Sequence, residues 1–135
     1  MAGASSSGKI GEINASHDHL IKNVAIQSLK KYPSISIYGN DYKTKDGTCI
    51  RDYIHVSDLA DIHIETLKYI NVKSKSLTLN CGYGKGYSVL DIVKILKKIN
   101  KKLVINYQPK RVGDIAQVYA NTKKFQKNII INLEY

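Results

Sequence analysis

The spacing of apolar residues changes several times along the first half of the chain, and each change predicts a different element. Leu20, Val24 and Leu29 follow helical spacing, which predicts a helix that ends at Lys31, before Pro33. Residues 34–38 alternate polar and apolar side chains, as a short strand does. The turn-forming residues 39–48 predict a loop, and residues 50–56 predict extended chain.

The second half repeats this alternation of strand and helix patterns. Strands are predicted at 76–80 and 103–107, and helices at 58–70, 89–99 and up to Lys127. Ser57 and Asn121 are expected to cap the first and last of these helices, while Ser88 and Asp91 predict a capping box for the middle one. This order is that of an α/β protein, but its few short strands favour a small lobe over a full doubly wound sheet.

Length and composition narrow the class of protein. A chain of 135 residues with 43% hydrophobic and 24% charged residues predicts one globular domain. No apolar run approaches the length of a membrane-spanning helix, and the first residues do not resemble a secretory signal, so no membrane association and a cytoplasmic location are expected. Cys49 and Cys81 cannot form a disulfide framework. His17 and His19 have H-x-H spacing without further ligands, so no metal site is expected.

The formal net charge of +10 raises the possibility of nucleic-acid binding. Nineteen of the 21 basic residues are lysines, and they accompany 19 isoleucines and ten asparagines. Such a bias is also typical of genome-wide base composition, and several lysine pairs fall near predicted helix ends, where cations are favoured. A nucleic-acid partner is therefore not expected.

A glycine-rich segment, Gly82-Tyr-Gly84-Lys-Gly86, separates a predicted strand from a predicted helix. Glycine-rich turns in this position can hold phosphate groups at a helix N-terminus. The dinucleotide pattern is G-x-G-x-x-G, however, and Asn106 stands where that pattern has an acidic residue. A turn that requires positive φ before a capped helix is the favoured interpretation.

The only two arginines each lie beside carboxylates. Arg51 is followed by Asp52 and Asp58, and Arg111 precedes Asp114 by three positions. A guanidinium binds phosphate or carboxylate through two parallel hydrogen bonds, which lysine cannot reproduce. Each arginine is thus either a phosphate ligand or a structural ion pair, Arg51 with Asp52 or Asp58 and Arg111 with Asp114, and spacing alone does not separate these readings.

Two long segments resemble the UDP-glucose 4-epimerase family of extended short-chain dehydrogenases. They are residues 35–42, Ile-Ser-Ile-Tyr-Gly-Asn-Asp-Tyr, and residues 46–61, Asp-Gly-Thr-Cys-Ile-Arg-Asp-Tyr-Ile-His-Val-Ser-Asp-Leu-Ala-Asp. Residues 3–12, 79–90 and 111–114 extend the likeness. The resemblance implies the small C-terminal substrate-binding lobe of that family. It further implies a single partial domain over residues 1–135, without the N-terminal NAD-binding Rossmann lobe and with a shortened C-terminal helix.

The resemblance also implies the chemistry. In this family a bound NAD oxidises the sugar C4 hydroxyl, a tyrosine acts as base, and the hydride returns to the other face of the keto-sugar. The family's G-x-x-G-x-x-G is missing from the 135 residues, and the Tyr-x-x-x-Lys match from Tyr69 to Lys73 lies outside the family's catalytic position. An inactive fragment is therefore expected, with one chain of a split enzyme completed by an N-terminal partner, or a basic nucleic-acid-binding module, as alternatives.

The resemblance implies that nine residues bind a UDP-sugar and that none of the chain's residues is catalytic. Arg51 and Arg111 match the arginines that bind the diphosphate, and Asp114 matches the carboxylate on the uridine ribose. The remaining six are expected near uracil, phosphate or sugar: Ser36, Ile37, Tyr38, His19, Leu20 and Val118.

Overall fold

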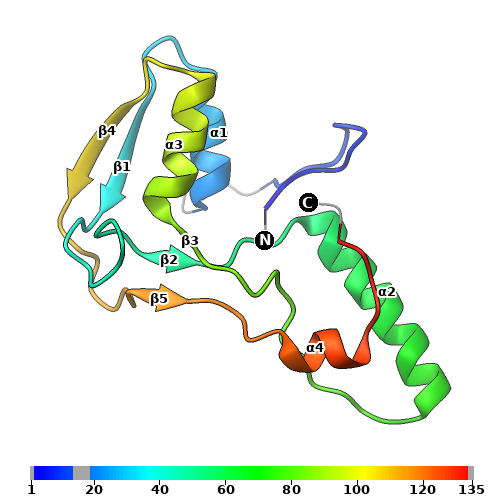
Figure 1. Cartoon of the computed structure of the whole chain (residues 1–135). Helices are drawn as coiled ribbons and strands as arrows, with labels where there is room; N and C mark the ends of the chain where they lie inside the picture. Colours follow the sequence, from blue (N-terminus) through cyan, green and yellow to red (C-terminus); the bar gives the residue numbers. More distant parts are fainter. Residues whose placement is uncertain (1, 14–18, 134–135) are drawn as a thin grey trace. The chain divides into compact units, whose positions relative to one another are not determined.

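The computed structural model describes residues 2–13 and 19–133, whose elements are labelled in Figure 1. In chain order these are α1 (Leu20–Ser28), β1 (Ser34–Tyr38), β2 (Ile50–Arg51), α2 (Val56–Lys73), β3 (Tyr87–Ser88), α3 (Val89–Ile99), β4 (Val104–Gln108), β5 (Gln117–Val118) and α4 (Lys123–Asn128). The predicted α/β class is confirmed. The chain divides into two compact units: unit 1 is Met1–Glu12, Asp52–Lys85 and Tyr119–Tyr135, and unit 2 is Ile13–Arg51 and Gly86–Val118. The predicted single lobe over residues 1–135 stays a prediction, because two compact units can belong to one lobe.

Unit 2 has its core between two helices and a pair of parallel strands. β1 pairs with β4 from Ser34 opposite Val104 to Tyr38 opposite Gln108. Burial alternates along β1, so Ile35 and Ile37 pack inward, against α1 and α3. The buried cluster consists of Val24, Ile35, Ile37, Val93 and Leu103. Each such side chain stabilises the fold by roughly 1.5–3 kcal/mol.

A second sheet in unit 2, made of three two-residue strands, positions Arg51. β2 is its central strand, antiparallel to β3 and parallel to β5. Arg51 lies opposite Tyr87 on one side and Val118 on the other. The backbone of this arginine is therefore fixed from both sides.

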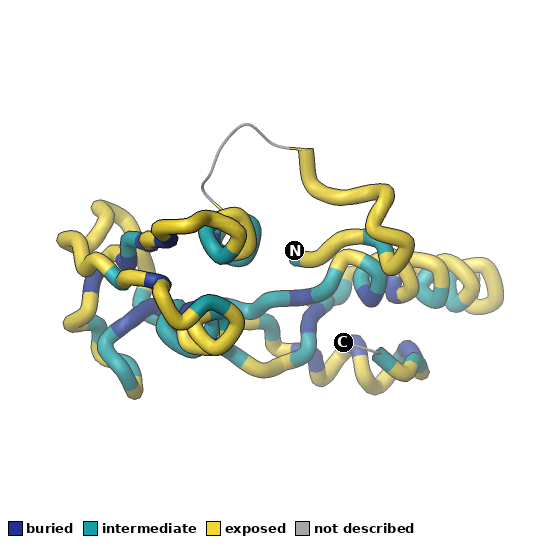
Figure 2. Tube along the Cα trace, turned by 90° about the horizontal axis from the view of Figure 1, so that it is seen from above, coloured by how far each residue is buried: buried dark blue, intermediate teal, exposed yellow. Residues whose placement is uncertain are grey.

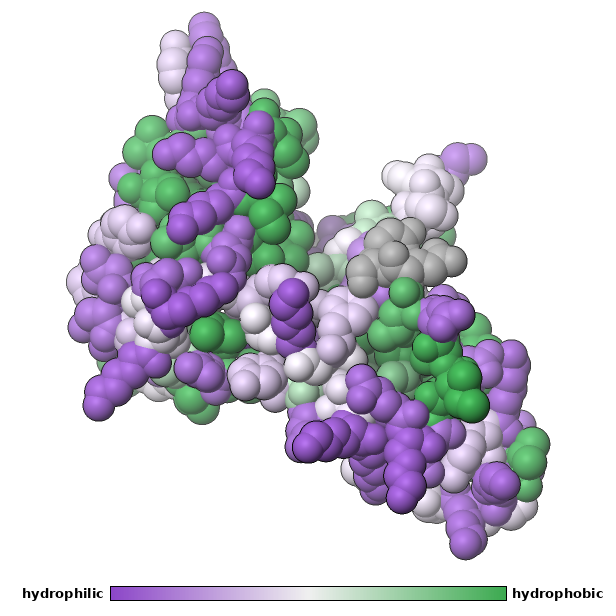
Figure 3. Space-filling model, in the orientation of Figure 1, coloured by the Kyte–Doolittle hydropathy of each residue, from purple (hydrophilic) through white to green (hydrophobic). Residues whose placement is uncertain are grey.

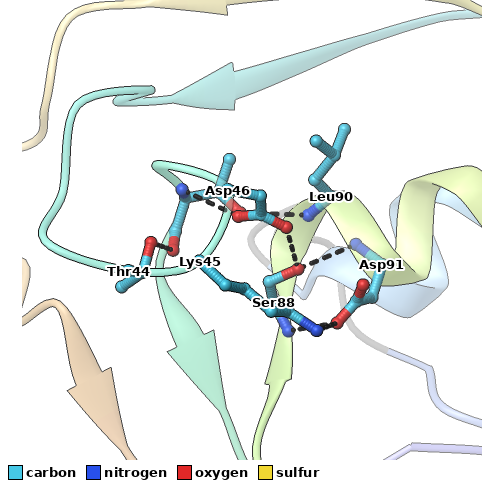
Figure 4. A network of polar contacts seen from close by, with 7 residues as sticks. Thr44, Lys45, Asp46, Ser88, Leu90 and Asp91 are labelled. Atoms are coloured by element: carbon cyan, nitrogen blue, oxygen red, sulfur yellow. Dashed lines mark hydrogen bonds and ion pairs between the residues drawn. The ribbon is translucent and has the colours of Figure 1, made fainter.

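The loop before β2 is tied to the start of α3 by buried polar groups (Figure 4). Asp46 accepts hydrogen bonds from the backbone N–H of Thr48 at 3.0 Å, the Thr48 hydroxyl at 2.8 Å and the Ser88 hydroxyl at 2.5 Å. Ser88 and Asp91 form the predicted capping box, with both reciprocal bonds present. Lys45 donates to Asp91 at 2.6 Å. The network fixes the loop two residues before Ile50 and so supports the position of Arg51.

Acid should weaken unit 2 through Asp46. Burial alone raises the pKa of Asp46, but hydrogen bonds from Ser88 and Thr48 outweigh it and hold the pKa below the ordinary 3.8. A lowered pKa means that Asp46 stabilises the fold above about pH 4 and that this contribution is lost as pH falls through the lowered value. We expect Asp46→Asn to cost about 1–3 kcal/mol at neutral pH and to flatten the acid limb of stability.

Urea unfolding over a pH series measures both effects. Asp41→Asn is the control, because that carboxylate is 69% exposed and pairs with a surface lysine, Lys110. Equal acid limbs in Asp46→Asn and the unsubstituted chain would contradict the assignment.

Unit 1 is built around α2, which begins after His55 and ends where Ser74 adopts a left-handed conformation. The Nδ1 of His55 accepts a hydrogen bond from the Ser57 N–H at 3.2 Å. Tyr83 donates to the buried Asp58 at 2.5 Å, and burial followed by this hydrogen bond raises the pKa of Tyr83 to about 12. The core packs around the cluster of Ile54, Ile62, Phe125 and Ile129.

The opposite face of α2 leaves a row of apolar residues exposed. Val56, Ala60, Ile64 and Leu67 are four and three positions apart, which places them on one face of the helix. Exposed and less exposed positions succeed each other along α2 in Figure 2. Ile64 is 53% exposed and Leu67 60% exposed. We call these four residues the α2 stripe.

The first helix ends at Ser28 and not at the predicted Lys31, and α2 is longer at both ends than the predicted 58–70. Three further local predictions were wrong. Residues 76–80 form no strand, because their alternating leucines have no neighbouring strand to pair with. His55 rather than Ser57 precedes α2, so Ser57 lies in its first turn. Thr122 rather than Asn121 is the N-cap residue of α4, although Asn121 does accept a hydrogen bond from the Lys123 N–H at 3.2 Å.

None of the helices in the described residues has the length and hydrophobicity needed to cross a bilayer.

Candidate nucleotide-sugar site

The nine residues assigned from the resemblance all belong to unit 2. The carboxyl ends of β1 and β4 and the N-terminal ends of α1 and α3 point to the same end of the unit, beside β2, β3 and β5 (Figure 1). Ligands of α/β proteins bind at the carboxyl ends of the strands, where helix N-termini also favour anions. Tyr38, Arg51, Arg111, Asp114 and Val118 all lie on strands or a loop at this end.

Arg51 is oriented by backbone carbonyls and faces one carboxylate. Its Nη1 donates to the carbonyl oxygens of Ile50 at 2.9 Å and Ile115 at 2.7 Å. Its Nη2 lies 3.7 Å from Oδ1 of Asp114, a loose ion pair in which both side chains are about a third exposed. The sequence suggested an ion pair of Arg51 with Asp52 or Asp58, but the structure shows one with Asp114. One edge of the guanidinium is thus held, and the other meets a partner that a phosphate can replace.

Arg111 reaches the end of β1 from the loop after β4. Its guanidinium carbon lies 3.8 Å from the centre of the Tyr38 ring. Tyr38 is 39% exposed, so the stacked pair is accessible. The ion pair between Arg111 and Asp114 that the spacing allowed is not formed, since Asp114 faces Arg51.

A tight turn joins these two pairs. The Asp114 N–H donates to the Arg111 carbonyl at 3.3 Å, which closes the turn 111–114. One segment of four residues therefore places Arg111 on Tyr38 and Asp114 beside Arg51. The turn collects the cations and the carboxylate of the candidate site around the ends of β1 and β2.

The other assigned residues differ in what they can present. Ile37 is 1% exposed and can offer a ligand only its backbone groups, whereas Leu20 is partly buried against the core. Ser36 is half-buried, His19 is exposed at the start of α1, and Val118 is 50% exposed on β5. The side chain of His19 does not cap α1.

A pair of residues next to the candidate site, Tyr42 and Lys110, was not anticipated from the sequence. Lys110 lies 4.6 Å from the centre of the Tyr42 ring and forms an ion pair with Asp41 at 3.0 Å. The Tyr42 hydroxyl is buried, and burial is the main reason that its pKa is raised to about 12, with smaller contributions from Cys49 and Asp114 and an opposing one from Arg51. The available signal was the position of Lys110 beside Arg111 in a loop already considered a candidate.

The glycine-rich loop is filled by the chain's own side chains. A Cβ atom on Gly82 would lie 2.3 Å from Oδ2 of Asp52, and one on Gly84 would lie 2.6 Å from Oγ1 of Thr122. Gly84 has a positive φ of 67°, as the turn interpretation predicted. Tyr69, which has the Tyr-x-x-x-Lys spacing with Lys73, donates a hydrogen bond from its hydroxyl to Oδ1 of Asn128 at 3.1 Å. It therefore lies where α2 contacts α4. The described residues contain no cluster of metal-binding side chains, and His17 lies outside them.

Gly84→Ala should therefore destabilise the chain. Left-handed backbone costs a residue with a Cβ about 1–3 kcal/mol, and here the contact with Thr122 adds to it. Gly8→Ala is a matched control, because Gly8 also has a φ of 67° but nothing lies within 4 Å of the position that its Cβ would take. Thermal unfolding should show a larger loss for Gly84→Ala; an equal loss in both variants would contradict the contact.

Comparisons with known proteins show which family the chain is similar to. The profile of the NAD dependent epimerase/dehydratase family matches residues 7–82. UDP-glucose 4-epimerases of Azospirillum brasilense and Cyamopsis tetragonoloba are 40% and 42% identical, over 96% and 94% of this chain. The chain spans 37% of the length of each, which agrees with the C-terminal part expected.

Solved structures extend the likeness to three dimensions. A UDP-glucose 4-epimerase of Stenotrophomonas maltophila with bound NAD and formylated UDP-arabinopyranose has a TM-score of 0.87 and 33% identity over 94% of this chain. A Bifidobacterium longum UDP-glucose 4-epimerase in complex with NAD+ and UDP has a TM-score of 0.82 and 36% identity, also over 94%. The chain covers 38% of each structure. Because the family profile covers more than half of its residues and the fold matches a solved relative over 94% of the chain, the chain belongs to the NAD dependent epimerase/dehydratase family.

Proposed function

We propose that this chain is the substrate-binding part of a UDP-glucose 4-epimerase and that unit 2 binds the UDP portion of a UDP-sugar. The observation that carries the proposal is the turn 111–114, which brings Arg111 onto Tyr38 and Asp114 beside Arg51 at the carboxyl end of β1. Two arginines, an exposed aromatic ring and a carboxylate are the groups that a nucleoside diphosphate requires: cations for phosphate, a ring face for stacking and an acceptor for ribose hydroxyls.

The geometry supports a division of roles. Nη1 of Arg51 is already occupied by two carbonyls, so its remaining edge can turn from Asp114 to a phosphate. Asp114 would then accept from the ribose. Arg111 would hold the second phosphate from its place on Tyr38. Ser36, Ile37 and Tyr38 would border the uracil, with Ile37 acting through its backbone, and Val118 would lie near the sugar. His19 and Leu20 would contribute the N–H groups of the first turn of α1.

The described residues do not fit NAD. Within the described residues the glycine-rich loop 82–86 joins α2 to β3 and lacks the G-x-G-x-x-G pattern, and Asp52 and Thr122 occupy the space beside Gly82 and Gly84. We therefore assign no hydride or proton transfer to this chain's residues. NAD, which the relatives bind, would be held by a Rossmann lobe outside these 135 residues, either on the same polypeptide or on an N-terminal partner.

The α2 stripe, in unit 1, is a surface that such a lobe could contact. Ile64 and Leu67 are more than half exposed on a helix whose other face is packed. Apolar rows of this kind are typical of surfaces that another domain covers. We propose that the NAD-binding lobe covers the α2 stripe.

Calorimetric titration of the chain with UDP, UMP and uridine tests the proposed function. Affinity should rise from uridine to UMP to UDP, because each phosphate adds a charge-assisted contact with the arginines. If uridine binds as tightly as UDP, the arginines contribute nothing and the proposal fails. Absence of saturable UDP binding would also contradict it.

A further inference from the structure

The positive charge of the chain is concentrated in two segments of unit 2 that contain α1, β1, β4 and most of α3. Residues 19–40 and 92–113 contain ten basic residues and no acidic residue. The other 91 residues carry 11 basic and 11 acidic residues, so the whole net charge of +10 comes from these two segments. A bias from base composition alone would raise lysine content throughout the chain and would not remove acidic residues from two segments that meet in space.

Six of these cations gather at the end of unit 2 opposite the candidate site. α1 and α3 both finish there, and Asn100 joins the two ends by donating to the Ser28 carbonyl at 2.8 Å. Val104 N–H then donates to the Pro33 carbonyl at 3.0 Å as the strands begin. The exposed lysines are Lys30, Lys31, Lys97, Lys98, Lys101 and Lys102. We call residues 29–32 and 97–102 the lysine tip; Figure 3 shows hydrophilic residues over this end of the unit.

Apolar side chains project from the same tip. Leu29 is 90% exposed, Tyr32 80% and Ile99 72%. Lysine at a helix C-terminus is explained by the helix dipole, but exposed aliphatic side chains among six lysines are not. A surface that combines clustered lysines with apolar anchors matches an anionic lipid bilayer, because the ammonium groups reach the headgroups while the apolar groups enter the interface.

We propose that the lysine tip is a docking surface for an anionic membrane. A bilayer is favoured over nucleic acid because every cation of the tip is lysine, none is arginine, and the one aromatic ring, Tyr32, already carries Lys31 at 5.5 Å. It is favoured over a protein partner because lysine is depleted in protein interfaces. The expectation of no membrane association was based on the absence of a spanning segment, which does not bear on peripheral binding.

The test is sedimentation of the full chain with phosphatidylcholine vesicles that contain or lack phosphatidylserine. Binding should require phosphatidylserine and should weaken as salt rises. The triple variant Lys98→Gln, Lys101→Gln, Lys102→Gln should bind about tenfold to a hundredfold more weakly, since each lysine near such a surface is worth about 1 kcal/mol. The matched triple Lys123→Gln, Lys124→Gln, Lys127→Gln removes the same charge from exposed positions of α4 and should change binding less than threefold, within roughly half a kcal/mol.

Leu29→Ser tests the apolar part. It should lower binding severalfold at every salt concentration, whereas Val72→Ser, at a 79% exposed position of α2, should not. Equal losses in the two lysine triples would overturn the proposal in favour of attraction by net charge alone. An unchanged Leu29→Ser variant, or displacement from vesicles by an equal charge concentration of a single-stranded oligonucleotide, would overturn it as well.

Discussion

Arg51→Ala is expected to weaken UDP binding by about ten- to a hundredfold. A hydrogen bond to a charged group contributes roughly 1.5–3 kcal/mol, and each 1.4 kcal/mol is a factor of ten in affinity. Arg51 should lie near the upper end of this range, because Ile50 and Ile115 hold its guanidinium in place before a ligand arrives. Little side-chain entropy is then lost on binding.

Two further variants separate geometry from charge. Arg51→Lys should recover only part of the affinity, since lysine restores the charge but not the planar fork. Lys110→Ala removes a neighbouring cation that pairs with Asp41 and should change UDP affinity less than threefold, within roughly half a kcal/mol. If Lys110→Ala weakens binding as much as Arg51→Ala, the site attracts UDP by general charge, and the assigned role of Arg51 is wrong.

The second large effect concerns activity. The 135-residue chain with added NAD should not interconvert UDP-glucose and UDP-galactose, because these residues lack the family's dinucleotide-binding G-x-x-G-x-x-G and the space beside Gly82 and Gly84 is taken by Asp52 and Thr122. Addition of the NAD-binding lobe of a 4-epimerase relative should produce turnover, since this chain would supply the UDP site. Coupled assay of UDP-galactose formation measures both states. Turnover by the chain alone, or none after the lobe is shown to bind, would contradict the division of roles.

The α2 stripe offers an internal control for that experiment. Ile64→Lys with Leu67→Lys should reduce complementation at least tenfold, because two desolvated charges would be placed in the proposed contact. Val72→Lys adds a charge at an exposed position of the same helix that is off the stripe. A loss of complementation in Val72→Lys equal to that in the double variant would exclude the stripe as the contact.

Elements defined by local signals were predictable from the sequence. β1 was predicted at its observed bounds, and so was α3, whose capping box is specified by Ser88 and Asp91 within four positions. The two-residue strands β3 and β5 were not, because they exist only through pairing with β2. Residues 76–80 show the converse: an alternating pattern without a partner strand does not form a sheet.

In the candidate site, too, local features were predictable from the sequence, whereas contacts between distant segments were not. Sequence reasoning identified Arg51 and Arg111 but could not place their partners. Asp114 lies 63 positions after Arg51 and reaches it only because β5 runs parallel to β2. The neighbouring Asp52 was a natural candidate by proximity, yet successive side chains of an extended chain point to opposite sides, and its Oδ2 accepts from the Ala120 N–H at 3.1 Å.

The most direct test of the proposed UDP site is to map UDP binding on the isotopically labelled chain by heteronuclear NMR. We expect saturable shifts at Tyr38, at Arg51 and along residues 111–118, with smaller changes over unit 1 and the lysine tip. The same titration of Arg51→Ala should need at least tenfold more UDP for equal shifts. Saturable shifts that exclude Arg51 and residues 111–114 would contradict the site. So would the absence of saturable shifts at millimolar UDP, a concentration that corresponds to about 4 kcal/mol of binding free energy.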